Sequence, residues 1–144
     1  MIRKITMEDI PECATLMMSV YNNETWQCCW PFGRAADYLS EYLLAKKFVG
    51  YVLIEDSILL GAIFCHEKIW WNNNELFVDE MFVLPRMQRK GYGTQLIKAA
   101  ENYIAENHLA GFTLATNRFS PAPDFYQKNG FSNADHVLFM YKIC

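Results

Sequence analysis

A short glycine-containing loop carries the clearest chemical signal in the sequence. Gln88-Arg89-Lys90-Gly91-Tyr92-Gly93 lies between an apolar run and a segment with apolar residues at helical spacing. Glycines let backbone amides approach a ligand closely, and amides at a helix N-terminus attract anions. Arg86, Arg89 and Lys90 add positive charge at the same place. The loop therefore predicts a pyrophosphate site formed by residues 88–94; the alternative is a tight turn whose basic residues are solvated.

Two better-known phosphate motifs are excluded by the residues that follow. A Walker loop needs Lys and then Ser or Thr directly after its second glycine, whereas Gly93 precedes Thr94 and Gln95. The dinucleotide fingerprint needs a third small residue, and this chain has Leu96 in its place. Neither of those two nucleotide-binding folds is therefore predicted.

The spacing Gln88-x-x-Gly91-x-Gly93, directly after Val-Leu-Pro at 83–85, resembles the signature of the GCN5-related N-acetyltransferase (GNAT) superfamily. In that family the loop wraps the pyrophosphate of acetyl-coenzyme A, which the resemblance implies as co-substrate here, without a metal. It also implies that backbone groups at the end of the preceding strand pair with the pantetheine arm. The implied cofactor-binding residues are Met81, Phe82, Val83, Gln88, Arg89, Lys90, Gly91, Tyr92, Gly93, Thr94, Asn117 and Tyr126.

A second segment, Ala-Pro-Asp-Phe-Tyr-Gln-Lys-Asn-Gly-Phe at residues 122–131, is similar to that family's Asn…Ala-x-x-Phe-Tyr-x-x-x-Gly-Phe motif. The resemblance implies that Tyr126 is the general acid toward the coenzyme A thiolate, a role that a phenol pKa of about 10 suits. The alternative is a packed tyrosine with a structural hydrogen bond. Asn117 lies two residues further upstream than the motif's asparagine, so its expected bond to the pantetheine amides stays open.

Acetyl transfer to an amine also needs a proton acceptor, and only Asp79 and Glu80 offer one within the predicted strand Leu76 to Leu84. Neighbours in a strand face opposite sides, so one of them at most points to the amine unless a bulge intervenes, as it often does in the family. Burial raises the pKa of a carboxyl group, which suits a base that acts directly or through water. Glu80 is the first candidate and Asp79 the second; the alternative is that one or both pair with Arg or Lys.

The elements that must position these residues predict one α+β domain over residues 1–144, with a mixed, mostly antiparallel sheet of six to seven strands and about four helices. Short connections make the middle three strands antiparallel, and the long helix after them makes the next pair parallel. Strands are expected at Ile2 to Ile5, Phe48 to Glu55, Ile58 to Trp71, Leu76 to Leu84, Phe112 to Thr116 and Val137 to Lys142, with Phe131 to Asp135 as a short partner. Helices are expected between Thr6 and Asn22, and at Ala35 to Lys46, Thr94 to Glu106 and Pro121 to about Asn129.

Aromatic residues are concentrated in the predicted loop between the first two helices. Trp26, Trp30 and Phe32 either pack as a core plug or wall a substrate pocket. The three histidines match no motif of the family, and we assign them to surface or hydrogen-bonded core positions rather than to a catalytic base. They are His66, His108 and His136.

The composition is that of an ordinary globular protein, with 52% hydrophobic and 20% charged residues and a net charge of −3 over 144 residues. This acidity argues against a nucleic-acid or anionic-membrane partner, and no run reaches the roughly 18 apolar residues of a membrane span. The N-terminus lacks the apolar region of a signal peptide. The five cysteines follow neither a disulfide framework nor a zinc site. These features predict a cytoplasmic protein with reduced thiols.

The motifs and the resemblance together predict an N-acetyltransferase that passes the acetyl group of acetyl-coenzyme A to a primary amine of a small molecule. The amine attacks directly, with Glu80 or Asp79 as base and Tyr126 as acid. Two alternatives stay open: a non-catalytic acyl-coenzyme A-binding or sensing module, and an enzyme that acetylates a protein or peptide. A homodimer is also expected, because dimers are common among proteins of this kind.

Overall fold

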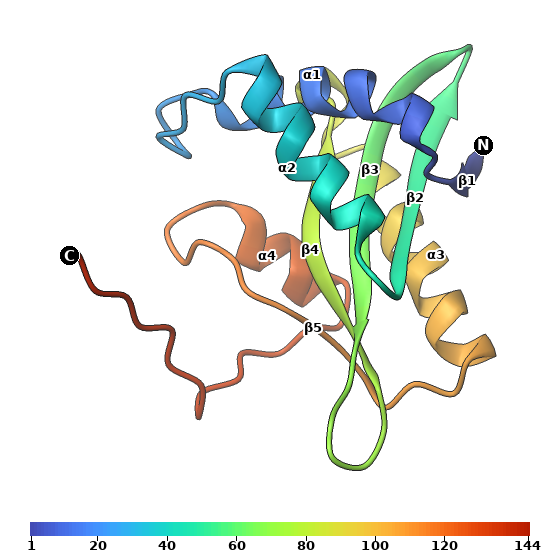
Figure 1. Ribbon diagram of the computed structural model, residues 1–144, viewed down its shortest axis with the longest axis vertical. Coiled ribbons are helices and arrows are strands. Elements are labelled where there is room, and N and C mark those ends of the chain that lie inside the picture. Colours follow the sequence, from blue (N-terminus) through green and yellow to red (C-terminus); the bar gives the residue numbers. More distant parts are fainter.

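Five strands form a single sheet in the computed structural model, which describes residues 1–144, and they lie side by side in chain order. The first four strands pair antiparallel, and the last two pair parallel because a helix crosses between them. Figure 1 shows the long β3–β4 hairpin at the centre of the sheet. The strands are β1 (Ile2–Lys4), β2 (Phe48–Glu55), β3 (Ile58–Lys68), β4 (Glu75–Val83) and β5 (Gly111–Leu114).

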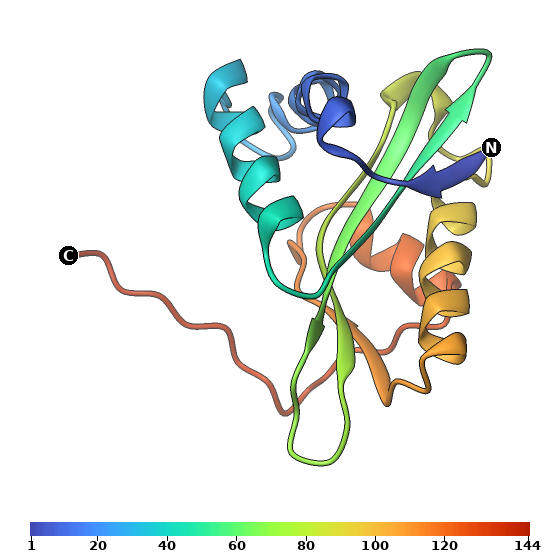
Figure 2. The same cartoon turned by 45° about the vertical axis from the view of Figure 1, so that its right-hand side comes forward.

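Four α-helices cover the sheet, two on each face (Figures 1 and 2). One pair is α1 (Ile10–Tyr21) and α2 (Phe32–Leu44), and the other is α3 (Tyr92–Glu106) and α4 (Ala122–Lys128). Short 3-10 turns, η1 (Met7–Asp9) and η2 (Pro85–Met87), lead into the first and third helices. None of the helices combines the length and the apolar character that crossing a bilayer requires.

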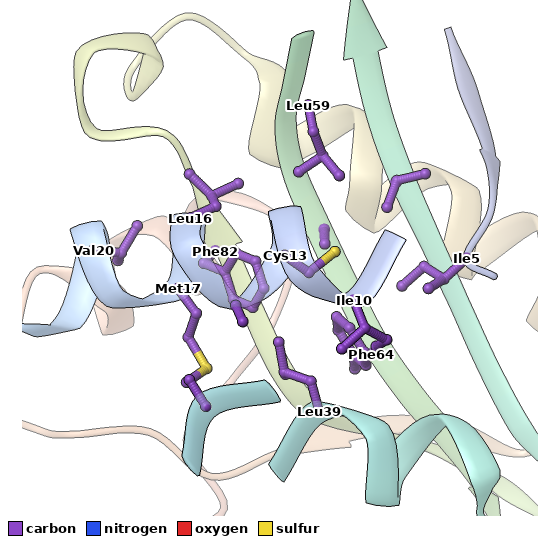
Figure 3. Packing of buried hydrophobic residues seen from close by; sticks show 14 residues of the cluster. Ile5, Ile10, Cys13, Leu16, Met17, Val20, Leu39, Leu59, Phe64 and Phe82 are labelled. Atoms are coloured by element: carbon purple, nitrogen blue, oxygen red, sulfur yellow. The ribbon is translucent and has the colours of Figure 1, made fainter. Parts of the chain in front are cut away.

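The core beneath α1 and α2 follows from apolar residues at helical spacing. Figure 3 shows Cys13 and Met17 of α1 and Leu39 of α2 against Phe64 and Phe82 of the sheet, all of them buried. The two phenylalanine rings lie 6.1 Å apart, one on β3 and one on β4. This packing fixes α1 and α2 over the strand that carries the two candidate acids.

A second core fills the space between the sheet and the other two helices. Leu96, Ile97 and Ala100 of α3 are buried against β2, β3 and β4. Phe125 and Tyr126 of α4 pack against the same cluster. The helix that follows the glycine loop and the helix of the second motif therefore share one face of the sheet.

An ion pair between Arg3 and Asp9 holds the N-terminal segment at the start of the first helix. Arg3 makes two hydrogen bonds of 2.8 Å to the carboxylate of Asp9. The same carboxylate accepts a hydrogen bond of 2.8 Å from the backbone amide of Thr6, which satisfies one donor at the helix start. Arg3 lowers the pKa of Asp9 by donating to it, and the Thr6 amide lowers that pKa further.

The predicted fold class is confirmed, but the number of strands is five rather than six or seven. Neither Val137 to Lys142 nor Phe131 to Asp135 forms a strand, because a strand needs a hydrogen-bonded neighbour and these segments do not reach one. Figures 1 and 2 show the C-terminal segment leaving the body of the molecule. Smaller differences lie at element ends: β3 stops at Lys68 instead of Trp71, and α2 begins at Phe32 instead of Ala35.

Candidate active site

The two parallel strands, β4 and β5, stop pairing just before Asp79 and Glu80. Pairing between β4 and β5 ends at Val78 and Leu114, whereas β4 continues to Val83. The carbonyl of Met81 accepts a hydrogen bond of 2.8 Å from the hydroxyl of Tyr21, and that of Val83 accepts one of 3.1 Å from Nε2 of Gln88. Both carbonyls therefore face the open side of β4, away from β3. Residues 79–83 thus form a strand edge that pairs with no other strand and faces the gap between β4 and β5.

Phe82 differs from its two neighbours in this edge. Its side chain is 2% exposed and lies in the core under α1 and α2. It stands opposite Ala62 in the ladder with β3, and peptide groups alternate between the two edges of an antiparallel strand. The peptide groups of Phe82 consequently face β3, whereas those of Met81 and Val83 face the gap.

The glycine loop has the geometry of an anion site. Gly91 precedes α3 with a φ of 84°, a left-handed conformation that glycine adopts without steric cost. The backbone amides of residues 89–94 donate no hydrogen bond within the protein. They gather at the N-terminus of a 15-residue helix, whose dipole favours negative charge. The loop predicted from the sequence is therefore present, and its backbone amides are free to donate hydrogen bonds to a ligand.

The second glycine of the loop has a different physical role. A Cβ at Gly93 would lie 2.9 Å from the ring of Phe125 on α4 and 3.3 Å from the methyl group of Met81. Gly93 thus lets α3, α4 and β4 approach one another. No atom lies within 4 Å of the corresponding position at Gly91. One glycine sets the backbone conformation, and the other allows the packing.

The side chains of the loop point in different directions. Arg86, Arg89 and Lys90 are exposed, as expected for groups that meet a charged ligand or water. Tyr92 instead donates its hydroxyl to Glu55 on β2, at 2.8 Å, so its contribution to an anion site is through its backbone. Thr94 is exposed on the first turn of α3.

A β-bulge places both candidate acids on the same face of the sheet. Phe64 stands opposite Glu80 and Cys65 opposite Val78, so Asp79 is the extra residue between them. The alternation of side chains is interrupted there, and both carboxylates lie on the side of α1 and α2. The sequence expectation that one at most would point to this side holds only for a regular strand.

Glu80 is surrounded by tyrosines from the first two helices. The hydroxyl of Tyr38 donates to its Oε1 at 2.6 Å. Burial raises the pKa of Glu80 above its ordinary value of 4.5, while the hydrogen bond from Tyr38 and the nearby hydroxyl of Tyr21, whose own proton goes to the carbonyl of Met81, counteract part of that rise. Tyr38 in turn packs against Trp30, with ring centroids 4.9 Å apart. Glu80 is therefore a half-buried carboxylate with a raised pKa, next to the aromatic residues Tyr38 and Trp30.

Asp79 has a histidine as its partner. Its Oδ2 lies 2.7 Å from Nδ1 of His66 on the neighbouring strand, and its side chain is 6% exposed. Burial raises the pKa of Asp79, and the hydrogen bond from His66 opposes that rise. Neither acid therefore pairs with Arg or Lys, and His66 lies beside the candidate acids.

Tyr126 reaches the gap from the opposite face. Its ring packs against Phe125 and Phe131 at 5.2 and 5.4 Å, and its hydroxyl makes no hydrogen bond within the protein. Burial raises the pKa of its phenol, and the nearby charge of Glu80 raises it further. A neutral phenol with a free proton thus lies near the carboxylate of Glu80, on the other side of the opening between β4 and β5.

The remaining predicted residues have mixed outcomes. Asn117 is exposed and its Oδ1 accepts a hydrogen bond of 2.9 Å from the amide of Phe119, so this oxygen is used within the loop. Trp30 packs against the core under α1 and α2, and Trp26 meets Tyr21 edge-on at 5.0 Å. Phe32 is 47% exposed. The aromatic loop is neither a closed plug nor an open wall, since two rings pack and one faces solvent.

Sequence reasoning missed three residues of the site: Tyr21, Tyr38 and His66. Neither Tyr21 nor Tyr38 belongs to a sequence motif, and His66 matches no motif of the family. The available signal was the hydroxyl of a tyrosine on an otherwise apolar helix face, because a buried tyrosine hydroxyl usually has a hydrogen-bond partner.

No group of three or more His, Cys, Asp and Glu side chains is placed to hold a metal ion.

A family model described as "Acetyltransferase (GNAT) domain" matches residues 41–133. No curated protein sequence matches the chain significantly. Solved structures match the chain over its full length. AAC(6')-Iy with the bisubstrate analogue CoA-S-monomethyl-acetylneamine is 19% identical, with 98% of that chain covered and a TM-score of 0.78. The aminoglycoside acetyltransferase meta-AAC0020 from an uncultured soil metagenomic sample, with sisomicin, is 17% identical (95% of that chain covered, TM-score 0.79), and a "possible acetyltransferase" from Clostridium difficile 630 is 21% identical (97% of that chain covered, TM-score 0.81).

Proposed function

Because the chain belongs to the acetyltransferase (GNAT) domain family, it is an acetyltransferase that uses acetyl-coenzyme A, and we propose that its acceptor is a primary amine of a small molecule. The observation that carries this proposal is that Glu80 and Tyr126 lie close enough, near the opening between β4 and β5, for the charge of Glu80 to raise the pKa of the phenol. A base and an acid on opposite sides of one gap are what acyl transfer to an amine requires.

The free amides of residues 89–94 would hold the pyrophosphate, with Arg89 and Lys90 adding charge. The unpaired edge of β4 would receive the pantetheine arm, with peptide groups of Met81 and Val83 as its partners. Together these groups would bring the thioester to the bulge at Asp79. The donor is thereby oriented by backbone rather than by flexible side chains.

Glu80 is the residue that we assign as base. Its raised pKa makes it a better proton acceptor than an ordinary carboxylate, and the acceptor ammonium group loses its proton to it directly or through a water molecule. Asp79 is already engaged by His66, and its charge is not among those that act on Tyr126. Asp79 consequently holds His66 in place and adds a negative charge near the amine.

Tyr126 is the residue that we assign as acid. Its hydroxyl has no partner in the protein, and its raised pKa keeps it protonated at neutral pH. As the bond from the acetyl carbon to sulfur breaks, this proton passes to the departing thiolate. The two assigned groups then exchange protons with solvent before the next turnover.

The acceptor class follows from the charges beside the gap. Two carboxylates on the same face favour a small molecule with several ammonium groups. Three solved structures of this fold were described with an aminoglycoside or coenzyme A ligand, which makes aminoglycosides a sensible first class to test. Polyamines share the same chemistry.

Release of the coenzyme A thiol in the presence of aminoglycosides, polyamines, amino acids and short peptides tests the proposal. Thiol release with a small amine, lost in Glu80→Gln and reduced in Tyr126→Phe, is the expected result. Binding of acetyl-coenzyme A without thiol release for any acceptor would favour a sensing module instead. Transfer to peptides alone would contradict the small-molecule assignment.

A further inference from the structure

The last residue of α1, Tyr21, reaches from that helix to the free edge of β4. Its hydroxyl donates a hydrogen bond of 2.8 Å to the carbonyl of Met81, a residue 60 positions further along the chain. This carbonyl lies beyond the point where β4 stops pairing with β5. The proposed function places the pantetheine arm along this edge, so Tyr21 lies beside the path of the donor.

Tyr21 contributes shape to this place rather than a proton. Its own proton is donated to the carbonyl of Met81. Burial is the main cause that raises the pKa of its phenol, and the nearby charges of Glu80 and Tyr126 raise that pKa further. The ring is therefore neutral at ordinary pH and lies close to both the proposed base and the proposed acid.

The ring of Tyr21 is held from more than one side. Trp26 meets it edge-on, with ring centroids 5.0 Å apart and an angle of 88° between the planes. Asn23 positions Trp26, because its Oδ1 accepts a hydrogen bond of 3.1 Å from the amide of Trp26 while its Nδ2 donates one of 2.6 Å to the carbonyl of Val20. Tyr21 also packs against the core under α1 and α2. Turning this ring aside would break contacts at both of its ends.

The opposite face of the same edge is occupied by apolar side chains. A Cβ at Gly93 would lie 3.3 Å from the methyl group of Met81 and 2.9 Å from the ring of Phe125. Met81, Phe125 and Tyr126 all pack against the core beneath α3 and α4. A group that reaches the edge at Met81 is therefore bounded by Tyr21 on one face and by these side chains on the other.

We propose that Tyr21 is the stop that limits the acyl group of the donor to acetyl. This inference rests on the proposed function, in which the thioester lies at the edge of β4. Each further methylene of a propionyl or butyryl group would press on a ring that is fixed by Met81 and Trp26. A rigid wall discriminates against the longer group by a clash, and one methylene in an apolar site changes affinity by about 10- to 200-fold.

Three substitutions of Tyr21 separate its ring from its hydroxyl. Tyr21→Phe keeps the ring and removes the bond to Met81, whereas Tyr21→Ala removes both. Tyr21→Leu retains part of the apolar contact and replaces Tyr21→Ala in the test if that variant does not fold, which circular dichroism decides. The matched control is Tyr42→Ala on α2, which removes a ring that packs on Tyr38 at 4.9 Å and whose hydroxyl bonds to Tyr38 alone.

Isothermal titration calorimetry with coenzyme A and its acetyl, propionyl, butyryl and hexanoyl thioesters measures the stop without an acceptor. In the parent chain, butyryl-coenzyme A should bind roughly tenfold or more weakly than acetyl-coenzyme A. In Tyr21→Ala the two affinities should agree within about threefold, whereas Tyr21→Phe and Tyr42→Ala should keep the difference of the parent chain. Thiol release with the best acceptor amine should show the same order, with kcat/KM for the butyryl donor raised relative to the acetyl donor only when the ring is removed.

The outcomes separate this inference from the proposed function. Equal binding of acetyl- and butyryl-coenzyme A by the parent chain, or an unchanged preference in both Tyr21→Ala and Tyr21→Leu, would contradict the stop alone. Equal loss of the preference in Tyr21→Phe and Tyr21→Ala would contradict a role of the ring, and a loss in Tyr42→Ala would assign the preference to the general packing of the helices. Failure of acetyl-coenzyme A itself to bind would contradict the proposed function together with the stop.

Discussion

Tyr38 on α2 donates its hydroxyl to Oε1 of Glu80 on β4 at 2.6 Å, although 42 residues separate them in the chain. This bond joins α2 to the strand that carries the proposed base. It stabilises the charged form of Glu80, against the effect of burial, which favours the neutral form. The proton affinity of the base is therefore set by the position of α2, and this dependence can be measured.

The pH profile of activity should report the pKa of Glu80. Because burial raises that pKa above 4.5, and only the carboxylate accepts a proton, kcat/KM should fall as the pH drops through a value above 4.5. Glu80→Gln should lower kcat about 10²- to 10³-fold and remove this acid limb. Steady-state kinetics between pH 5 and 9 measures both effects. An unchanged acid limb in the variant would assign the limb to another group.

The stability of Glu80→Gln should not fall together with its activity. A carboxyl group whose pKa is raised by folding makes the protein most stable below its unfolded pKa, and that stability is lost as the pH rises toward the folded pKa. At pH 7 the partly buried charge of Glu80 is unfavourable for folding, so Glu80→Gln should leave Tm unchanged or raise it. A clear drop of Tm at pH 7 would mean that the carboxylate is needed for folding as well as for catalysis.

Tyr38→Phe should shift the acid limb to higher pH. Removing a hydrogen bond to the carboxylate form raises the pKa of Glu80, so a larger fraction of the enzyme is protonated at pH 6. The matched control is Tyr42→Phe, whose hydroxyl lies 3.4 Å from that of Tyr38 and makes no bond to Glu80. A shift of equal size in both variants would show that the effect comes from the tyrosine pair rather than from the direct bond.

The two loop glycines should respond differently to alanine. Gly93→Ala places a methyl group 2.9 Å from the ring of Phe125, which must push α4 away from α3 and misplace Tyr126. We expect a loss of about 1–3 kcal/mol in stability together with a fall in kcat. Gly91→Ala meets no atom within 4 Å but strains a φ of 84°, so about 1 kcal/mol and weaker binding of acetyl-coenzyme A are expected.

Chemical denaturation and isothermal titration calorimetry distinguish these two outcomes. If Gly91→Ala were the variant with the greater loss of stability, the packing role assigned to Gly93 would be wrong. If acetyl-coenzyme A bound with unchanged affinity to both variants, the free amides of the loop would not be its pyrophosphate site.

The ion pair at the N-terminus should make stability depend on pH at the acid end. The pKa of Asp9 is lowered in the folded chain, chiefly by the hydrogen bonds from Arg3, so its contribution is present above the ordinary value of 3.8 and is lost as the pH falls below it. Asp9→Asn should cost about 1–2 kcal/mol at pH 7, a modest figure because the Arg3 side chain is 40% exposed. Glu8→Gln, on the same turn, is the control. Urea unfolding at pH 7 and pH 3 should show the difference between Asp9→Asn and the parent chain shrinking at pH 3.

The order of the elements could be read from the sequence because each depends on neighbours close along the chain. Apolar spacing located all four helices and all five strands, and the glycines at 91 and 93 located the loop that precedes α3. Membership of the acetyltransferase family, expected from the two motifs, is confirmed by the match over residues 41–133. The strand predicted at Val137 to Lys142 does not form, because the partner that a strand needs lies outside its own sequence neighbourhood.

The sequence by itself determined which residues could do chemistry and which local structure would carry them, since strand alternation, helix periodicity and glycine conformation are properties of short segments. Only the tertiary structure decided how they meet. The bulge turned Asp79 and Glu80 to one face, α1 and α2 supplied Tyr21 and Tyr38, and β3 supplied His66. These contacts join residues 13 to 60 positions apart, and they depend on strand register and helix packing that no local pattern specifies.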